Sequence, residues 1–164
     1  MIVYKDIFSG DEMLSDSFPA TETDAFLEVE SANITVGDEQ INIGANPAEG
    51  EVEEGPEAQR VNNIVHGFKL HETSFAKPDY LKALKDYMMR VKAYLQEKTP
   101  DRVAPFMAAA KVAAANIVAN FADYTFYTGE SYEQTAMIVL SKFVGEATTP
   151  TFFFWKDGLR QDKY

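Results

Sequence analysis

The sequence predicts a single α+β domain, and two patterns in its 164 residues support this prediction. Short runs of alternating or β-branched apolar residues fill the first third and the last quarter of the chain, which indicates mainly antiparallel strands. One long helical stripe lies between them. Strands grouped on either side of a helical segment are typical of α+β folds, and the chain is long enough to bury one core.

The predicted strands cover residues 2–5, 26–30, 33–36, 40–43, 63–70, 124–127, 136–142 and 151–155. The last of these holds three phenylalanines and a tryptophan, Phe152 to Trp155. Such an aromatic run favours a buried central strand, with an exposed partner site as the alternative. Asp157-Gly158 then signals a turn.

The helical stripe runs from Pro78 to Glu97 and predicts an amphipathic helix. Pro78 suits a first helical turn, and Thr99 is a candidate cap for a second helix that ends near Asn120. Alanine clusters in the second helix allow close packing, so we expect an antiparallel hairpin over about residues 78–120. Because this second helix contains proline, lysine and asparagine, we expect a buried helix rather than a membrane span.

Residues 44–59 contain five glutamates and no basic side chain. A segment with so little apolar surface cannot offset its ordering entropy, so we expect a mobile acidic loop. Its glutamates present hard oxygen ligands, although their spacing does not match an EF-hand. The glutamates are Glu49, Glu51, Glu53, Glu54 and Glu57.

The charge is distributed unevenly along the chain. The protein has a net charge of −11, yet residues 69–111 carry nine basic and five acidic side chains. A basic helix on an acidic body suits docking to a macromolecule of complementary charge, although a solvated lysine-rich helix gives the same pattern. The candidate docking residues are Lys82, Lys85, Arg90 and Lys92. The large negative charge argues against nucleic acid as a partner.

Motifs for catalysis are absent from the sequence. It has no phosphate-binding loop, no nucleophile elbow and no His-Glu-x-x-His, and it contains no cysteine. Without cysteine there is neither a disulfide nor a thiolate zinc site. As residues 63–70 predict a strand that continues towards His71, we expect His66 and His71 on opposite strand faces, with structural or surface roles. No secretory signal is present at the start, so we expect a cytoplasmic protein.

Several segments together resemble the translationally controlled tumour protein family. They are Met1-Ile2-Val3-Tyr4-Lys5-Asp6 with Asp11-Glu12-Met13, Ile43-Gly44-Ala45-Asn46-Pro47, His71-Glu72-Thr73-Ser74-Phe75, Phe126-Tyr127-Thr128-Gly129-Glu130, and Phe152 through Leu159. The similarity covers nearly the whole chain in order. It implies a twisted β-tent body, a projecting helical hairpin and a disordered acidic loop. It also implies a monomer, because cysteine-linked dimers are not available to this chain.

The resemblance further implies a regulator of growth and translation that binds small GTPases, translation elongation factor 1, and tubulin or microtubules. Glu12, with Asp11 and Asn46 on the same surface, is the implied GTPase contact. Weak calcium binding is implied for Asn46, and Glu49 and Glu51 are further candidate ligands. No other cofactor, no zinc and no integral membrane segment are expected.

Two function classes remain open at this point. The first is a non-enzymatic interaction protein that docks on a GTPase through Glu12. Promotion or inhibition of nucleotide release fits it equally, since both need only differential affinity for GTPase states. The second is a calcium-binding, chaperone-like protein whose apolar body shields client proteins.

Overall fold

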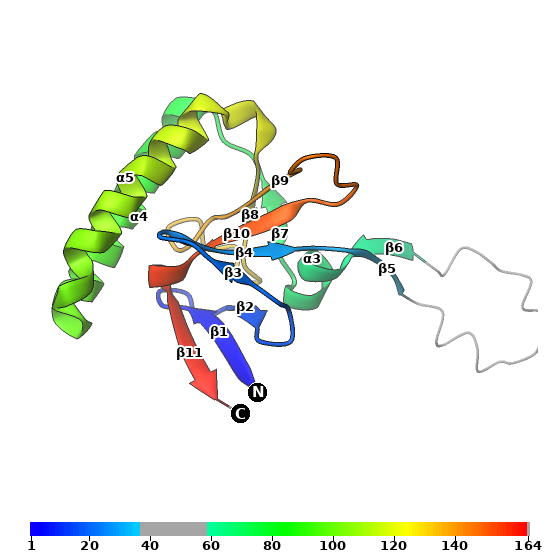
Figure 1. The fold of residues 1–164 in the computed structure, drawn as a ribbon, viewed down its shortest axis with the longest axis horizontal. Coiled ribbons are helices and arrows are strands. Elements are labelled where there is room, and N and C mark those ends of the chain that lie inside the picture. Colours follow the sequence, from blue (N-terminus) through cyan, green and yellow to red (C-terminus); the bar gives the residue numbers. More distant parts are fainter. Residues whose placement is uncertain (37–58, 164) are drawn as a thin grey trace, which may run out of the picture.

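The computed structural model describes residues 1–36 and 59–163, and it has an α+β architecture, as predicted (Figure 1). The strands are β1 Ile2–Asp6, β2 Glu12–Ser15, β3 Thr21–Glu22, β4 Phe26–Glu30, β5 Asn33–Val36, β6 Gln59–Asn62, β7 His71–Thr73, β8 Thr125–Thr128, β9 Val139–Lys142, β10 Thr151–Trp155 and β11 Leu159–Lys163. The α-helices are α3 Asn63–Phe68, α4 Lys77–Lys98 and α5 Val103–Ala119. Within the described ranges, the strands form a six-stranded sheet (β3-β4-β10-β9-β8-β7), a three-stranded sheet (β11-β1-β2) and the β5-β6 ribbon.

The aromatic strand β10 lies at the centre of the larger sheet. All five of its residues are buried, and it pairs antiparallel with β4 on one side and β9 on the other. The ring centroid of Phe26 lies 4.5 Å from that of Trp155 and 5.6 Å from that of Phe153. A strand covered on both faces needs apolar residues at every position. The prediction of a buried central strand is therefore confirmed.

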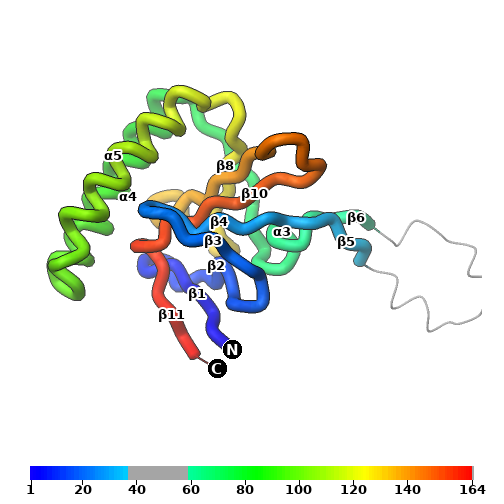
Figure 2. The backbone as a smooth tube through the Cα atoms, in the orientation of Figure 1, coloured from blue at the N-terminus to red at the C-terminus, as the bar shows by residue number. Residues whose placement is uncertain are grey.

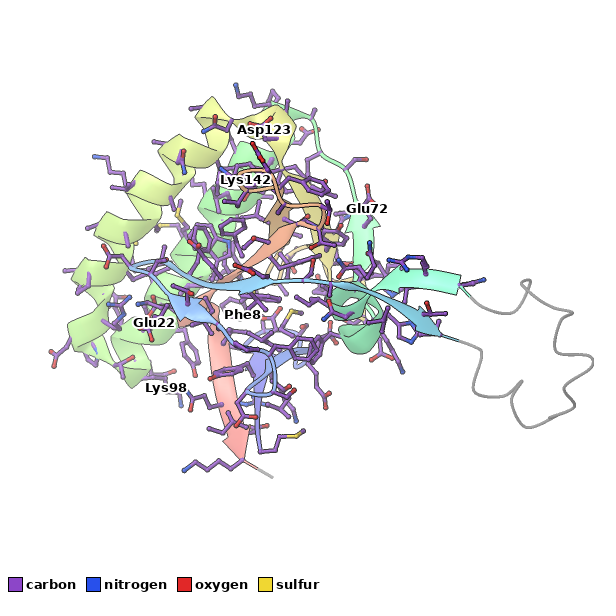
Figure 3. The ribbon with its side chains drawn as sticks, turned by 45° about the vertical axis from the view of Figure 1, so that its right-hand side comes forward. Phe8, Glu22, Glu72, Lys98, Asp123 and Lys142 are labelled. Atoms are coloured by element: carbon purple, nitrogen blue, oxygen red, sulfur yellow. The ribbon has the colours of Figure 1, made fainter. Side chains whose placement is uncertain are left out.

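The helices α4 and α5 form an antiparallel hairpin along one side of the sheets, which confirms that prediction (Figure 1). Pro78 lies in the first turn of α4, where its missing N–H costs no hydrogen bond. Side chains fill the space between the hairpin and the strands (Figure 3). The core residues contributed by the hairpin are Tyr80, Leu84, Tyr87, Val91, Leu95, Phe106, Ala110, Ala113 and Ile117.

The expectation that the second helix is a buried helix is only partly correct. Residues Pro100–Ala119 are long and apolar enough to cross a membrane by length and composition, but core helices pass the same test. One face of α5 belongs to the core, whereas Val112 is 71% exposed. The alanines that allow α5 to approach α4 also occupy its outer face, so composition alone does not indicate which residues are covered.

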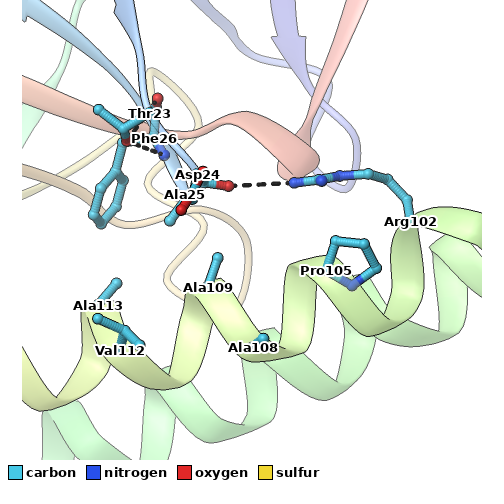
Figure 4. Close-up of a pocket in the computed structure, with 10 residues that line it drawn as sticks. All are labelled: Thr23, Asp24, Ala25, Phe26, Arg102, Pro105, Ala108, Ala109, Val112 and Ala113. Carbon is cyan, nitrogen blue, oxygen red and sulfur yellow. Dashed lines mark hydrogen bonds between the residues drawn. The ribbon is translucent and has the colours of Figure 1, made fainter.

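The turn of the hairpin is fixed to the body by Arg102. Thr99 does not cap α5 through its side chain, contrary to the sequence prediction, because a 3₁₀ turn at Pro100–Arg102 separates Thr99 from that helix. The Arg102 guanidinium donates to both carboxylate oxygens of Asp157, at 2.7 and 2.8 Å. It also donates to the Asp24 carbonyl at 3.3 Å (Figure 4). A groove of about 550 Å³ lies beside this contact, between α5 and residues 23–26.

The strand predicted at residues 63–70 is wrong, because α3 occupies most of this segment. The Asn62 side chain accepts hydrogen bonds from the amides of Ile64 and Val65, at 3.0 and 3.2 Å, which caps the helix at its start. Lys69 ends the helix in the left-handed conformation, with φ of 56°. Consequently His66 lies in α3 and His71 in β7, so the two histidines are not on opposite faces of one strand.

The backbone trace places β1 and β11 side by side, although they come from opposite ends of the chain (Figure 2). The β5-β6 ribbon extends from the other side of the body relative to the helical hairpin (Figure 1). Strand β6 begins at Gln59, the last residue of the predicted acidic loop. The rest of that loop and the predicted strand at residues 40–43 lie outside the described residues.

Candidate protein-interaction face

Asp11 and Glu12 lie where the chain turns from β1 into β2. Gly10 has φ of 79° at this turn, and its amide donates to the Asp6 carbonyl at 2.9 Å. The Asp11 amide donates to Ser9 Oγ at 3.2 Å. The predicted turn is therefore present, but Glu12 itself is the first residue of β2.

The two carboxylates of this turn have different surroundings. Asp11 Oδ2 accepts hydrogen bonds from the amide of Ser131 at 3.1 Å and from its hydroxyl at 2.7 Å. Glu12 is exposed, and its carboxylate makes no hydrogen bond or ion pair with any residue that the structure describes. Asp11 therefore holds the turn in place, and Glu12 projects from it towards solvent.

Residues 129–135, which we call the Ser131 loop, connect this turn to other parts of the surface. The Tyr132 ring stacks on His71 with a centroid separation of 3.8 Å and an interplanar angle of 14°. Gln134 Nε2 donates to Thr73 Oγ1 at 3.0 Å. Because the Asp11 contacts fix the other end of the loop, it is attached to the body along its length.

Arg90 joins α4 to the Ser131 loop. Its guanidinium lies 4.0 Å from the ring centroid of Phe8, in the β1-β2 turn, and it donates a hydrogen bond to the Thr135 carbonyl. Glu133 lies close by, since its carboxylate accepts hydrogen bonds from the hydroxyl and the amide of Thr135. These hydrogen bonds lower the pKa of Glu133, and the nearby Arg90 charge lowers it further. The structure therefore brings Arg90 and Asp11, two of the predicted docking residues, to the same side of the molecule.

The other predicted basic residues of α4 are not gathered around Arg90. Successive helical residues are about 100° apart, so Lys85 and Lys92 project roughly 150° away from it. Lys82 lies between these directions and is exposed, as is Lys85, whereas Lys92 is half-buried. The four basic residues thus cover both flanks of α4 and form no single patch.

The candidate calcium ligands Asn46, Glu49 and Glu51 lie outside the described residues. In residues 1–36 and 59–163, no group of three or more histidine, aspartate or glutamate side chains is arranged to hold a metal ion. The calcium prediction therefore stays a prediction for residues 37–58.

Sequence reasoning missed Asp6, which positions the whole turn. This aspartate is fully buried, and its carboxylate accepts the amide hydrogens of Phe8 and Met137, both at 2.9 Å. Burial raises the pKa of the Asp6 carboxyl, and those hydrogen bonds oppose the rise. Nothing in the local sequence indicates the contact with Met137, since the two residues are far apart along the chain.

The antiparallel sheets, the helical hairpin and the projecting Glu12 define a class of protein, small α+β proteins with a β-tent body. A model of the family described as "Translationally controlled tumour protein" matches residues 1–160. The chain belongs to this family.

Relatives in several fungi support the assignment. The chain is 44% identical to a translationally-controlled tumor protein homolog of Candida glabrata and 44% identical to that of Saccharomyces cerevisiae, each over 99% of both chains. The solved structure of the Schizosaccharomyces pombe protein p23fyp superposes with a TM-score of 0.83 at 42% identity, covering 100% of both chains. The Caenorhabditis elegans protein superposes with a TM-score of 0.68 at 26% identity, covering 100% of this chain and 99% of the other.

Proposed function

We propose that this protein is a cytosolic regulator that binds a small GTPase through the Asp11-Glu12 turn, with translation elongation factor 1 as its partner in translation. The observation that carries the proposal is the contrast between the two carboxylates. Asp11 is fixed by Ser131, and Glu12 is exposed on the turn beside it. Because the backbone of this turn is already held in place, only the Glu12 side chain has to lose conformational freedom when a partner binds.

The outer face of α4 is a second docking surface in this proposal. Lys85 is exposed on that face and Lys82 at its edge, next to the groove beside the Ser131 loop, and an acidic partner such as tubulin would contact them. Contacts of this kind are screened by salt, because the Debye length falls to about 8 Å at physiological ionic strength. Binding through α4 should therefore weaken steeply as salt rises, whereas capture of an apolar client protein should not.

Regulation of the GTPase needs no covalent chemistry by this protein. A partner that binds the nucleotide-free state more tightly promotes release, and one that binds the GDP-bound state more tightly inhibits it. The release rate of a fluorescent GDP analogue, measured with and without this protein, gives the direction of the effect.

The decisive experiment is an NMR titration of isotope-labelled protein with GDP-loaded elongation factor 1A. We expect shifts centred on the amides of Glu12 and Ser131. Glu12→Gln should weaken binding with little change in the melting temperature, since the side chain is exposed. Glu30→Gln, another exposed carboxylate at a strand end, is the matched control. Unchanged spectra at tens of micromolar partner would refute the proposal.

A further inference from the structure

A groove of about 600 Å³ lies between α4 and the Ser131 loop. Ala83 and the charged residues of one flank of α4 form its first wall, and Gln134 and Thr135 form the second. Phe75 contributes an apolar surface to the same groove. Thr135 belongs to the loop that Asp11 holds through Ser131, so this loop connects the second wall of the groove to the Asp11-Glu12 turn.

Contacts within the protein hold the walls of the groove in place. Phe75 packs edge-on against Tyr80 and Phe126, with both centroid distances at 5.7 Å, so its ring cannot turn freely. Gln134 is held by Thr73 at 3.0 Å. The hydrogen bond from Arg90 to the Thr135 carbonyl ties the two walls together. A partner that enters this groove therefore need not order its walls first.

The charges around the groove determine what fits it. Asp79 and Asp86 are exposed on the groove wall and form no ion pair with any residue in the described ranges. Glu133 does not line the groove but lies next to its second wall, where its carboxylate accepts a hydrogen bond from the Thr135 hydroxyl at 2.5 Å. Of the two cations, Arg90 already contacts Phe8 and Thr135. The groove lining itself has two acidic residues, Asp79 and Asp86, and two cations, Lys82 and Arg90. With the neighbouring Asp11, Glu12 and Glu133, and with Lys5 opposite Glu12 in the β1-β2 pairing, five acidic side chains stand against three basic ones.

We propose that this groove receives a basic segment of the partner protein, which inserts an aliphatic side chain between Ala83 and Phe75 and places lysines or arginines on Asp79, Asp86 and Glu133. The inference rests on the proposed function in one respect, because it assumes that one partner contacts both the groove and the Asp11-Glu12 turn. The groove is then the apolar part of that binding surface, and the turn is its acidic part. Apolar anchors at the centre of an interface supply most of its affinity, and rim charges supply orientation. The groove and the turn thus have separate tasks in one interface.

A short peptide tests the groove without the GTPase. The probe is the capped peptide acetyl-Arg-Leu-Lys-Leu-Arg-amide, titrated into isotope-labelled protein to millimolar concentration. We expect shifts at the amides of Phe75, Ala83 and Thr135. Replacing the peptide's leucines by serine, or its basic residues by glutamate, should abolish them. The absence of shifts, or shifts that survive both replacements, would overturn the inference.

Filling the groove gives a second, independent test. Ala83→Leu adds a larger side chain at a half-buried helical position, and leucine is a good helix former, so the protein should fold. We expect peptide binding to weaken about fivefold or more, which corresponds to roughly 1 kcal/mol. Ala115→Leu on the outer face of α5 is the matched control and should bind as the natural protein does. Equal affinity in both variants would refute the groove.

Charge is tested by the double variant Asp79→Asn and Asp86→Asn, with Glu97→Gln and Asp101→Asn as a control that removes two exposed carboxylates elsewhere. Only the Asp79→Asn and Asp86→Asn double variant should lose affinity for the peptide.

The two proposals can also fail separately. If Glu12→Gln weakens binding of GDP-loaded elongation factor 1A but Ala83→Leu does not, the groove inference is wrong and the proposed function stands. If the peptide binds the groove and elongation factor 1A does not bind the protein at all, the proposed function is wrong and the groove inference stands.

Discussion

Gly129 lies directly against the side chain of Asp11, so closely that a Cβ at position 129 would be 2.5 Å from Asp11 Oδ2 and 2.6 Å from Met13 Cε. Real Cβ atoms essentially never approach other atoms to such distances. The absence of a side chain at position 129 is what lets the Asp11 carboxylate reach Ser131. The two residues therefore depend on each other, although they lie far apart in sequence.

Gly129→Ala should lower the free energy of unfolding by about 1–3 kcal/mol, because the added methyl group must push Asp11 and Met13 aside. Urea denaturation measures this. The control is Gly67→Ala in α3, where a Cβ meets nothing within 4 Å. That change should stabilise by up to about 1 kcal/mol, since alanine loses less entropy in a helix. A Gly129→Ala protein as stable as the natural one would contradict the steric argument.

Arg102→Ala should destabilise the protein by about 1–3 kcal/mol, because it leaves the carboxylate of Asp157 without its charged partner. The Asp157 side chain is only 7% exposed. Arg102→Lys keeps the charge but loses the two-pronged contact, so its effect should be intermediate. Arg160→Ala removes a more exposed pair with Asp162 and should change stability by less than about 0.5 kcal/mol. Equal effects of Arg102→Ala and Arg160→Ala in urea denaturation would contradict this prediction.

Asp6 should titrate above its ordinary pKa of 3.8, because burial raises the pKa of its carboxyl. The native state then holds this proton more tightly than the unfolded chain does. As pH falls from neutrality through the raised pKa, the contribution of Asp6 to stability increases, which is opposite to the usual behaviour of a carboxylate. The amide shifts of Phe8 and Met137 in an NMR pH titration report this event. A midpoint below 3.8 would show that hydrogen bonding outweighs burial.

Asp162 should behave in the opposite way, because hydrogen bonds with Lys5 and Arg160 lower its pKa. Its contribution to stability is present above the unfolded pKa and is lost as pH falls through the lowered folded pKa. The side-chain carboxyl carbon of Asp162, followed by NMR, should therefore have a midpoint below 3.8. Lys5→Ala should move that midpoint upward, and an unchanged midpoint would exclude Lys5 as a cause.

Arg90→Ala should loosen the Ser131 loop without unfolding the protein. It removes a cation–π contact with Phe8, worth about 0.5–1 kcal/mol at an exposed site, and the hydrogen bond to Thr135. Hydrogen exchange should become faster at the amides of Ser131 and Thr135, which donate hydrogen bonds to Asp11 and Glu133 respectively. Lys98→Ala, at the exposed end of α4, should leave these rates unchanged. Identical rates in both variants would mean that the contacts with Asp11, His71 and Thr73 hold the loop without Arg90.

Elements whose signals are local were predictable from the sequence. The apolar spacing of α4 specifies which face it buries, and the aromatic run of β10 needs cover on both sides. The prediction for residues 63–70 was wrong. Ile64 and Val65 favour a strand by propensity, but the Asn62 cap selects a helix. Propensity is a weak guide where one side-chain cap decides the backbone conformation.

Strands that depend on distant partners were not predictable. β11 is short and mostly polar, and it forms only because β1 lies beside it. The candidate site shows the same limit. The sequence predicted that Asp11 and Glu12 lie in a turn. It did not indicate that Ser131, which lies 120 residues from Asp11, bonds to the Asp11 carboxylate and leaves that of Glu12 exposed. Arg90 was predicted as one of four docking cations, and only the packing of Phe8 and Thr135 around it distinguishes it from the lysines.

The pairing of β1 with β11 has a consequence for biosynthesis. β1 is synthesised before the helical hairpin and the larger sheet, and its partner β11 is synthesised after them. Until then, one edge of β1 has unpaired backbone groups that can bind another extended chain. This edge of β1 therefore stays open to other extended chains after the hairpin has been synthesised and until β11 pairs with it.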